Sequence, residues 1–167
     1  MATSYKHIPA ERQVDEFACW AACIKWWKKA KRSVYRSQTL LIRDYNHLTN
    51  DAGEMQPAQM KKVLEGEGFK VEEPTSMNFT MAKLRAHLEH SPLVVGYVTD
   101  AQTLHVNVIY EIVNEVSGSL ERYSQVRVME PQAFNGGDWR GEHQIKSLGD
   151  FTWWGTCMIG SLKPKSN

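Results

Sequence analysis

The spacing of apolar residues changes near Ser91-Pro92, and this change restricts the fold class more than any other feature. Before it, apolar side chains recur at helical spacing in four segments. After it, runs rich in β-branched and aromatic residues indicate strands. Helices followed by an antiparallel sheet predict an α+β fold. The expected helices are residues 19–32, 37–45, 58–65 and 80–90, and the expected strands are residues 93–99, 104–113, 125–129 and 155–162.

The first expected helix carries a cysteine at its first turn. Trp20, Cys23, Ile24 and Trp27 repeat on one face, so this helix is amphipathic and has a buried side. Cys19 lies where backbone N–H groups have no helical partner and the helix dipole is positive, which favours a thiolate over a thiol. The position predicts that Cys19 is a nucleophile and that packing shields Cys23.

Gln13 precedes Cys19 by six residues, far enough for the loop between them to bring its amide back toward the thiol. Attack of a thiolate on a carbonyl places negative charge on oxygen. A side-chain NH2 group and the backbone N–H of the nucleophile can stabilise that charge together as an oxyanion hole. Gln13 is therefore the expected side-chain donor.

The pattern Gln13-x5-Cys19-Trp20, followed by small residues and an amphipathic helix, resembles the papain-like cysteine peptidases of the short bacterial type. These include bacteriocin-leader peptidase domains and effector proteases of plant-pathogenic bacteria. The resemblance implies one papain-like domain over residues 1–167, with a helical lobe at about 1–92 and a sheet lobe at about 93–167. It also implies a cysteine endopeptidase that acts through a thioester.

His105 lies near the start of the long second strand and is the expected general base. Its imidazole can take the proton from sulfur and later give it to the leaving amine, because its ordinary pKa lies near neutral pH. A histidine at this point of the chain also matches the order of the papain-like folds. The main rival is His143, which falls in a polar, glycine-containing segment expected to be a surface loop.

In papain-like enzymes a third residue orients the histidine, and in the short bacterial relatives it commonly belongs to an Asp-Pro pair at the end of the next strand. The matching place here reads Glu130-Pro131, a departure by one methylene. Pro131 is expected to end that strand, so that Glu130 turns toward the imidazole. The reserve candidates for this role are Gln132, Asn135 and Asp138.

Composition excludes several other classes of protein. The chain has 167 residues, of which 42% are hydrophobic, enough for one soluble domain with a substantial core, and its net charge of +1 does not favour nucleic acid or an anionic membrane. Three cysteines argue against a disulfide framework, and six scattered histidines give no metal-ligand spacing. We therefore expect no metal and no cofactor.

The same residues are also compatible with two other functions. Amidases, deamidases and transglutaminases also use a cysteine–histidine dyad, although the cell-wall peptidase pattern with Ser-Gly after the cysteine is absent. A degenerate peptidase domain can instead be a non-catalytic peptide-binding module, which an intact Cys19 and His105 disfavour.

The expected setting follows from the N-terminus and from the resemblance. No signal peptide or membrane span is visible, which predicts a bacterial cytoplasmic enzyme or a protein exported into a target cell by a dedicated secretion system. The expected partners are a protein or peptide substrate and, for an effector or toxin, a cognate inhibitor or immunity protein. We expect a monomer that does not bind nucleic acid or membranes.

Overall fold

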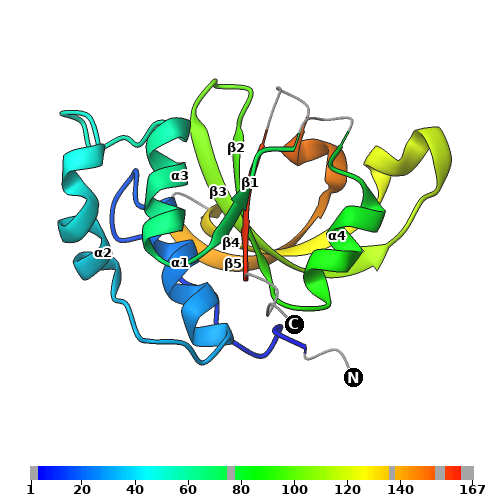
Figure 1. Cartoon of the computed structure of the whole chain (residues 1–167), viewed down its shortest axis with the longest axis horizontal. Helices are drawn as coiled ribbons and strands as arrows, with labels where there is room; N and C mark the ends of the chain where they lie inside the picture. The colour runs from blue at the N-terminus through cyan, green and yellow to red at the C-terminus, as the bar shows by residue number, and fades with distance from the viewer. Residues whose placement is uncertain (1–3, 75–77, 136–137, 153–156, 163–167) are drawn as a thin grey trace.

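An antiparallel sheet lies at the centre of the protein, with helices on both of its faces (Figure 1). The computed structural model describes residues 4–74, 78–135, 138–152 and 157–162. The sheet has six strands in the order β1-β6-β2-β3-β4-β5, which confirms the expected α+β class. The strands are β1 Lys70–Glu72, β2 Leu93–Val98, β3 Leu104–Asn114, β4 Gln125–Asn135, β5 Asp138–Ser147 and β6 Met158–Ser161.

The helices form where the apolar spacing predicts them, and local capping explains where three of them begin. The Ser37 and Thr80 side chains accept hydrogen bonds from backbone N–H groups of the first turns of their helices. Pro57 occupies a first turn, where its missing N–H has no cost. The α-helices are α1 Cys19–Ala30, α2 Gln38–Tyr45, α3 Pro57–Gly66 and α4 Met81–Leu88, and the short 3-10 helices are η1 Asn46–Leu48, η2 Gly118–Tyr123 and η3 Leu148–Phe151.

Two hydrophobic clusters cover the two sides of the sheet, and one of them fixes the position of α1. One cluster packs α1 and α3 against the side of β3 that carries Val106, Val108 and Tyr110. The other packs α4 and η3 against the opposite side, which includes Ile109. Alternation along β3 therefore places His105 on the same side as Ile109. Because α1 is almost wholly buried, including Trp26 at 0% exposure, its first turn is held rigidly at one end of the sheet.

The structure differs from the expected division at residue 92 in two ways. Strand β1 lies in the half of the chain expected to be helical, and it pairs with β6. Helix α4 packs on the other side of the sheet from α1, so the four helices do not form one helical lobe. A three-residue strand is too short to show an apolar period, which explains why β1 escapes prediction.

Two expectations about β4 and its neighbour were wrong. Pro131 does not end β4, which continues to Asn135 with a register shift between Glu130 and Ala133. A proline is tolerated at such an irregularity because no ladder hydrogen bond from its nitrogen is required. The segment expected to be a loop around His143 is instead β5, which pairs with β4. The start of the expected closing strand lies outside the described residues. So does Trp153-Trp154, an aromatic pair whose size favours packing between lobes.

Within the described ranges, no helix is long and apolar enough to span a membrane. The same part of the chain contains no group of three or more histidine, cysteine or acidic residues that could hold a metal ion.

Candidate active site

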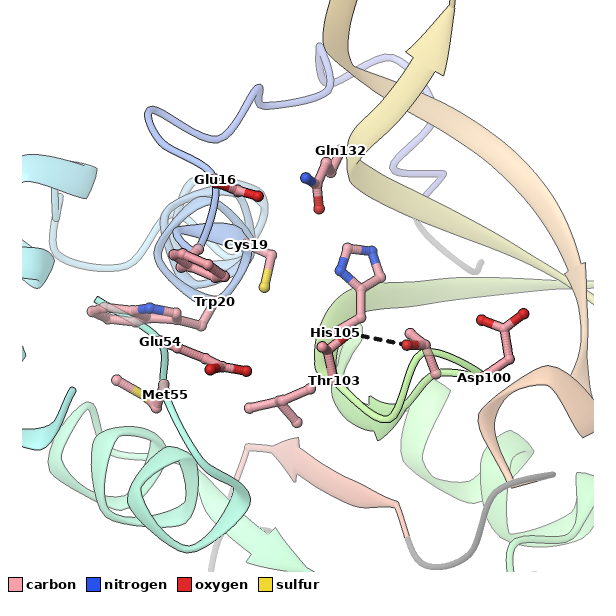
Figure 2. A pocket seen from close by; sticks show the side chains of 12 residues that line it. Glu16, Cys19, Trp20, Glu54, Met55, Asp100, Thr103, His105 and Gln132 are labelled. Carbon is pink, nitrogen blue, oxygen red and sulfur yellow. Dashed lines mark hydrogen bonds between the residues drawn. The ribbon is translucent and has the colours of Figure 1, made fainter. Parts of the chain in front are cut away.

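Cys19 is the first residue of α1, as the sequence predicts. Its side chain points from the helix toward His105 across a pocket of about 380 Å³ (Figure 2). The backbone N–H groups of this first turn have no partner within the helix, so they are directed toward the same region. Cys19 is thus buried, at 7% exposure, and still lines the pocket.

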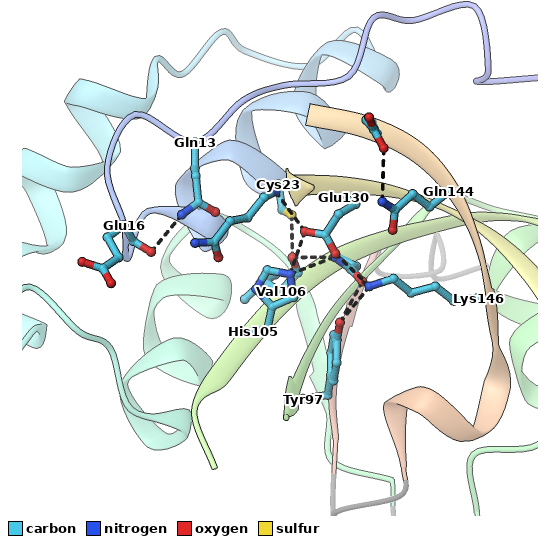
Figure 3. Close-up of polar contacts among 12 residues, drawn as sticks. Gln13, Glu16, Cys23, Tyr97, His105, Val106, Glu130, Gln144 and Lys146 are labelled. Carbon is cyan, nitrogen blue, oxygen red and sulfur yellow. Dashed lines mark hydrogen bonds and ion pairs between the residues drawn. The ribbon is translucent and has the colours of Figure 1, made fainter. Parts of the chain in front are cut away.

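His105 presents a different ring nitrogen to each of its two neighbours. Its Nε2 lies 2.7 Å from Glu130 Oε1, which leaves Nδ1 on the side of Cys19 (Figures 2 and 3). Strand β3 positions the ring, and Tyr97, directly across on β2, contacts it edge-on with ring centroids 5.7 Å apart. The ring is therefore fixed between a thiol and a carboxylate, the arrangement that proton transfer needs.

Glu130 is buried on β4 and touches His105, as the sequence predicts for the orienting residue. Strands β3 and β4 pair antiparallel, which brings the two side chains together. Besides the imidazole, the carboxylate accepts hydrogen bonds from the Gln132 backbone N–H, the Asn107 amide and the Lys146 ammonium. The extra methylene of glutamate does not prevent the contact with histidine.

The electrostatics of the pair favour an imidazolium beside a carboxylate. Burial lowers the pKa of His105, but hydrogen bonds to Cys19 and Glu130 and the charges of both groups raise this pKa to about 9. Burial raises the pKa of Glu130, but His105 and Lys146 together lower it to about 2. Near neutral pH the histidine therefore carries a proton that it can donate.

Gln13 belongs to the loop that precedes Cys19, and its side-chain amide is turned toward that loop and not toward the pocket. Its Nε2 donates to the backbone carbonyls of Asp15 and Glu16, at 2.8 Å each (Figure 3). Its Oε1 is buried without a hydrogen-bond partner. Both amide hydrogens thus stabilise the turn leading into α1. The backbone N–H of Gln13 also donates to Pro131 O, which ties this loop to β4.

Three polar residues that sequence reasoning missed surround the carboxylate. Lys146 Nζ lies 2.8 Å from Glu130 Oε2, and it also donates to Asn107 Oδ1 and to Tyr97 Oη (Figure 3). Asn107 was detectable, because it follows His105 by two residues on one side of an apolar strand. Lys146 gave no such signal, since its strand was not expected.

The pocket that contains Cys19 and His105 is an open cleft between α1, the loop before α3 and the turn between β2 and β3. Gln132, a reserve candidate for the orienting role, points its side chain into this cleft above the imidazole (Figure 2). Among the residues that the structure describes, three acidic residues line the cleft and no lysine or arginine does. The lining residues are Glu16, Phe17, Cys19, Trp20, Glu54, Met55, Thr99, Asp100, Thr103, Leu104, His105 and Gln132.

The competing cysteines and the competing histidine have structural roles. All three cysteines are free, and Cys23 is fully buried with its Sγ 3.3 Å from Val106 O. Burial raises the pKa of both Cys23 and Cys157. His143 contacts the Tyr110 hydroxyl and Ile8 O, so it anchors the N-terminal segment. The side chains of Asn135 and Asp138, the other reserve candidates, are not described.

Taken together, a cysteine at a helix start, a protonated histidine and a buried carboxylate define a cysteine hydrolase of the papain-like architecture. Comparison with family sequence profiles agrees, since the profile described as papain-like cysteine protease AvrRpt2 matches residues 3–132. The chain belongs to this family of papain-like cysteine proteases. It is therefore a hydrolase.

Solved structures show the same fold at low sequence identity. The peptidase domain of Streptococcus ComA, a bifunctional ABC transporter involved in quorum sensing, aligns with a TM-score of 0.61 and 15% identity over 94% of this chain and 100% of that domain. A double-glycine-motif protease from an AMS/PCAT transporter, solved with a leader peptide, aligns with a TM-score of 0.52 and 11% identity over 93% of each chain. No curated protein sequence matches the chain significantly.

Proposed function

We propose that the protein is an endopeptidase in which Cys19, His105 and Glu130 act as nucleophile, acid–base and orienting residue. The observation that carries this assignment is the placement of the His105 ring, with Nε2 on the carboxylate and Nδ1 toward the thiol. A binding module has no use for a buried carboxylate that keeps a histidine protonated. A protease uses that arrangement in every turnover.

In the first half of the reaction, the Cys19 thiolate attacks the carbonyl carbon of a peptide bond. The oxyanion that forms accepts a hydrogen bond from the Cys19 backbone N–H. His105 Nδ1 donates its proton to the leaving nitrogen, the C–N bond breaks, and the amine product leaves a thioester on Cys19. Glu130 holds the opposite ring nitrogen throughout, so the imidazole keeps its tautomer and orientation.

In the second half, neutral His105 takes a proton from water, and the oxygen of that water attacks the thioester. The C–S bond then breaks, which releases the carboxylate product and restores the thiolate–imidazolium pair. We assign the second oxyanion donor to the Gln13 amide, which exchanges one of its carbonyl partners for the oxyanion when substrate enters. Two observations support this step. Gln13 precedes Cys19 by six residues, and its amide binds the loop that leads directly to Cys19.

Mass spectrometry of peptides released from a proteome-derived library tests the proposal. Wild type should produce new termini at a consistent motif, and Cys19→Ala should produce none. Cys23→Ala is the matched control, because it removes a buried thiol that faces a backbone carbonyl, and it should still cleave. Equal cleavage by Cys19→Ala would refute the assignment. Release of ammonia or exchange of side-chain amides without peptide cleavage would favour a deamidase or transglutaminase, and binding without any reaction would favour a peptide-binding module.

We further propose that this protease is a bacterial effector or toxin, and that it acts as a monomer in a target cell where a cognate inhibitor can restrain it. The resemblance of the Gln13-x5-Cys19-Trp20 pattern to effector proteases supports this setting, and the assignment of all reacting groups to one chain supports the monomer. Expression in candidate target cells should be harmful with wild type and harmless with Cys19→Ala. Light scattering should give the mass of a single chain, 19.1 kDa.

A further inference from the structure

The catalytic carboxylate has a second cationic neighbour besides the histidine. Glu130 Oε1 accepts from His105 and the Gln132 backbone, while Oε2 accepts from Lys146 and Asn107. We propose that Lys146 is a positioning residue that keeps Glu130 ionised and aligned with His105 whether the imidazole is charged or neutral. This inference rests on the proposed role of Glu130.

Every N–H donor of the Lys146 ammonium has a hydrogen-bond partner, as expected for a positioning residue. Its three N–H donors bind Glu130 Oε2 at 2.8 Å, Asn107 Oδ1 at 2.9 Å and the Tyr97 hydroxyl at 3.1 Å. The Tyr97 hydroxyl donates in turn to Asn107 Oδ1 at 3.0 Å. With every donor used, the ammonium has one position, and it fixes the plane of the carboxylate from the side opposite His105.

Lys146 and Glu130 lie on neighbouring strands but are not directly opposite each other. In the β4–β5 ladder Lys146 pairs with Val126, whereas Glu130 pairs with Glu142. Residues directly opposite share a side of the sheet, and Val126 and Glu130 share a side because they are separated by an even number of positions. The lysine therefore reaches the carboxylate by extending its stem along the sheet. A shorter cationic side chain at this position would not make the contact.

The reaction cycle explains why a permanent cation is needed. The Glu130 side chain is only 6% exposed, and a buried carboxylate without a partner is strongly destabilised. His105 loses its proton to the leaving amine in every turnover, so it is an intermittent partner. Lys146 takes no part in these proton transfers. The carboxylate can then keep its position and its charge while His105 is neutral, until the imidazole becomes charged again during hydrolysis of the thioester.

Other titratable groups around Glu130 do not supply this charge. Cys23 on α1 and Tyr97 on β2 interact electrostatically with Glu130, Cys19 interacts with His105, and Asp150 of η3 acts on Tyr97. All four are neutral or negative, and burial followed by the charge of Glu130 raises the pKa of Tyr97. Among the described residues that contact this carboxylate, Lys146 is the one lysine or arginine.

The pH dependence of Cys19 alkylation tests the proposal without any substrate. An opposite charge within hydrogen-bonding distance lowers the pKa of a carboxyl group by about 1–3 units, so its removal should move the low-pH limb of the alkylation curve upward by about one unit or more. We expect this shift in Lys146→Met and not in Lys146→Arg, which keeps the charge. If Lys146→Met does not fold, Lys146→Gln is measured instead.

Two controls separate this role from a general effect of losing a buried lysine. Lys28 also contacts a glutamate whose side chain is only 8% exposed, with its Nζ 3.5 Å from Glu67 Oε1. Lys28→Met should lose stability without moving the low-pH limb. In a Glu130→Gln background, Lys146→Met should add no further shift, because its effect acts through the carboxylate. A uniform loss of rate with an unmoved limb, or an equal shift in Lys28→Met, would overturn the proposal.

The same experiment keeps the proposal separate from the proposed peptidase activity. If the low-pH limb of the alkylation curve moves in Lys146→Met but the wild-type protein cleaves no peptide, the role of Lys146 is supported and the peptidase activity is refuted. A limb that stays in place, in a protein that cleaves peptides, refutes the role of Lys146 alone.

Discussion

At the scale of single residues, Glu130 shows how one carboxylate can contact two basic side chains at once. Its two oxygens are directed to different cations, with His105 Nε2 at 2.7 Å from one and Lys146 Nζ at 2.8 Å from the other. Charge-assisted hydrogen bonds of this length are the stronger kind found in proteins. Glutamate therefore serves here where the sequence pattern of relatives has aspartate.

Replacing Glu130 with glutamine removes the negative charge and keeps the shape. The pKa of His105 should fall from about 9 toward its ordinary value of 6.5, because the carboxylate helps to raise it. We expect kcat/KM to drop by about two orders of magnitude, and its high-pH limb to move to lower pH. Glu142→Gln, on β5 directly across from Glu130, is the matched control and should leave the pH profile unchanged. An unmoved high-pH limb in Glu130→Gln would show that Glu130 does not act on His105.

Gln13 stabilises the loop before Cys19 through the same amide to which we assign the second oxyanion donor. Gln13→Ala should lower the free energy of unfolding by about 1–2 kcal/mol, because the carbonyls of Asp15 and Glu16 lose their donor. It should also lower kcat about 100-fold, because one oxyanion donor is lost. Gln38→Ala is the control, since its amide binds the same loop at Arg12 O and Val14 N away from the pocket. Equal losses of kcat in both variants would assign Gln13 a structural role only.

At the scale of elements, the sequence predicts what is local and misses what depends on a neighbour. The helices and β2 to β4 carry their own period and caps, so the positions of Cys19, His105 and Glu130 on them could be predicted. Strand β5 lies at the edge of the sheet, and its apolar residues Trp139 and Ile145 are exposed, so its sequence shows no buried apolar face. It forms because β4 offers a long ladder of backbone partners, which no pattern within β5 reveals. Lys146 and its contacts were unpredictable for the same reason.

Strand β5 also supports the segment that leads to the nucleophile. A Cβ atom on Gly141 would lie 2.3 Å from Glu11 O and 2.4 Å from Glu11 C, so Gly141→Ala must displace this segment. We expect a loss of about 1–3 kcal/mol in urea unfolding and a fall in kcat, since Gln13 follows two residues later. Gly96→Ala, where the nearest atom is 3.5 Å away, should have a much smaller effect on both. Wild-type stability in Gly141→Ala would mean that the N-terminal segment does not pack on β5.

At the scale of the whole molecule, the active site is a product of long-range contacts. The proposed nucleophile Cys19 comes from α1, His105 from β3, Glu130 from β4 and Lys146 from β5. Only the folded chain brings these four residues together. Their mutual ionisation therefore exists in the folded state and disappears on unfolding. This makes the stability of the entire chain depend on the charges of the site.

The two perturbed groups set opposite ends of the pH range. Burial lowers the pKa of His105, but Cys19 and Glu130 raise it from 6.5 to about 9, so its stabilising contribution is complete below pH 6.5 and is lost as the pH rises through 9. Burial raises the pKa of Glu130, but His105 and Lys146 lower it from 4.5 to about 2. The contribution of Glu130 is therefore complete above pH 4.5 and is lost as the pH falls through 2.

We accordingly expect both contributions to be complete between pH 4.5 and 6.5. In urea unfolding, the difference in free energy between wild type and Glu130→Gln should be largest in that window, and it should shrink between pH 6.5 and 9 as wild-type His105 loses its proton. Each unit by which Glu130 raises the pKa of His105 is worth about 1.4 kcal/mol of that difference. Glu142→Gln should show no such trend, because the Glu142 carboxylate accepts from Arg140 Nε at 2.7 Å. A difference between wild type and Glu130→Gln that stays constant from pH 5 to 10 would mean that the imidazole and the carboxylate do not ionise together in the folded protein.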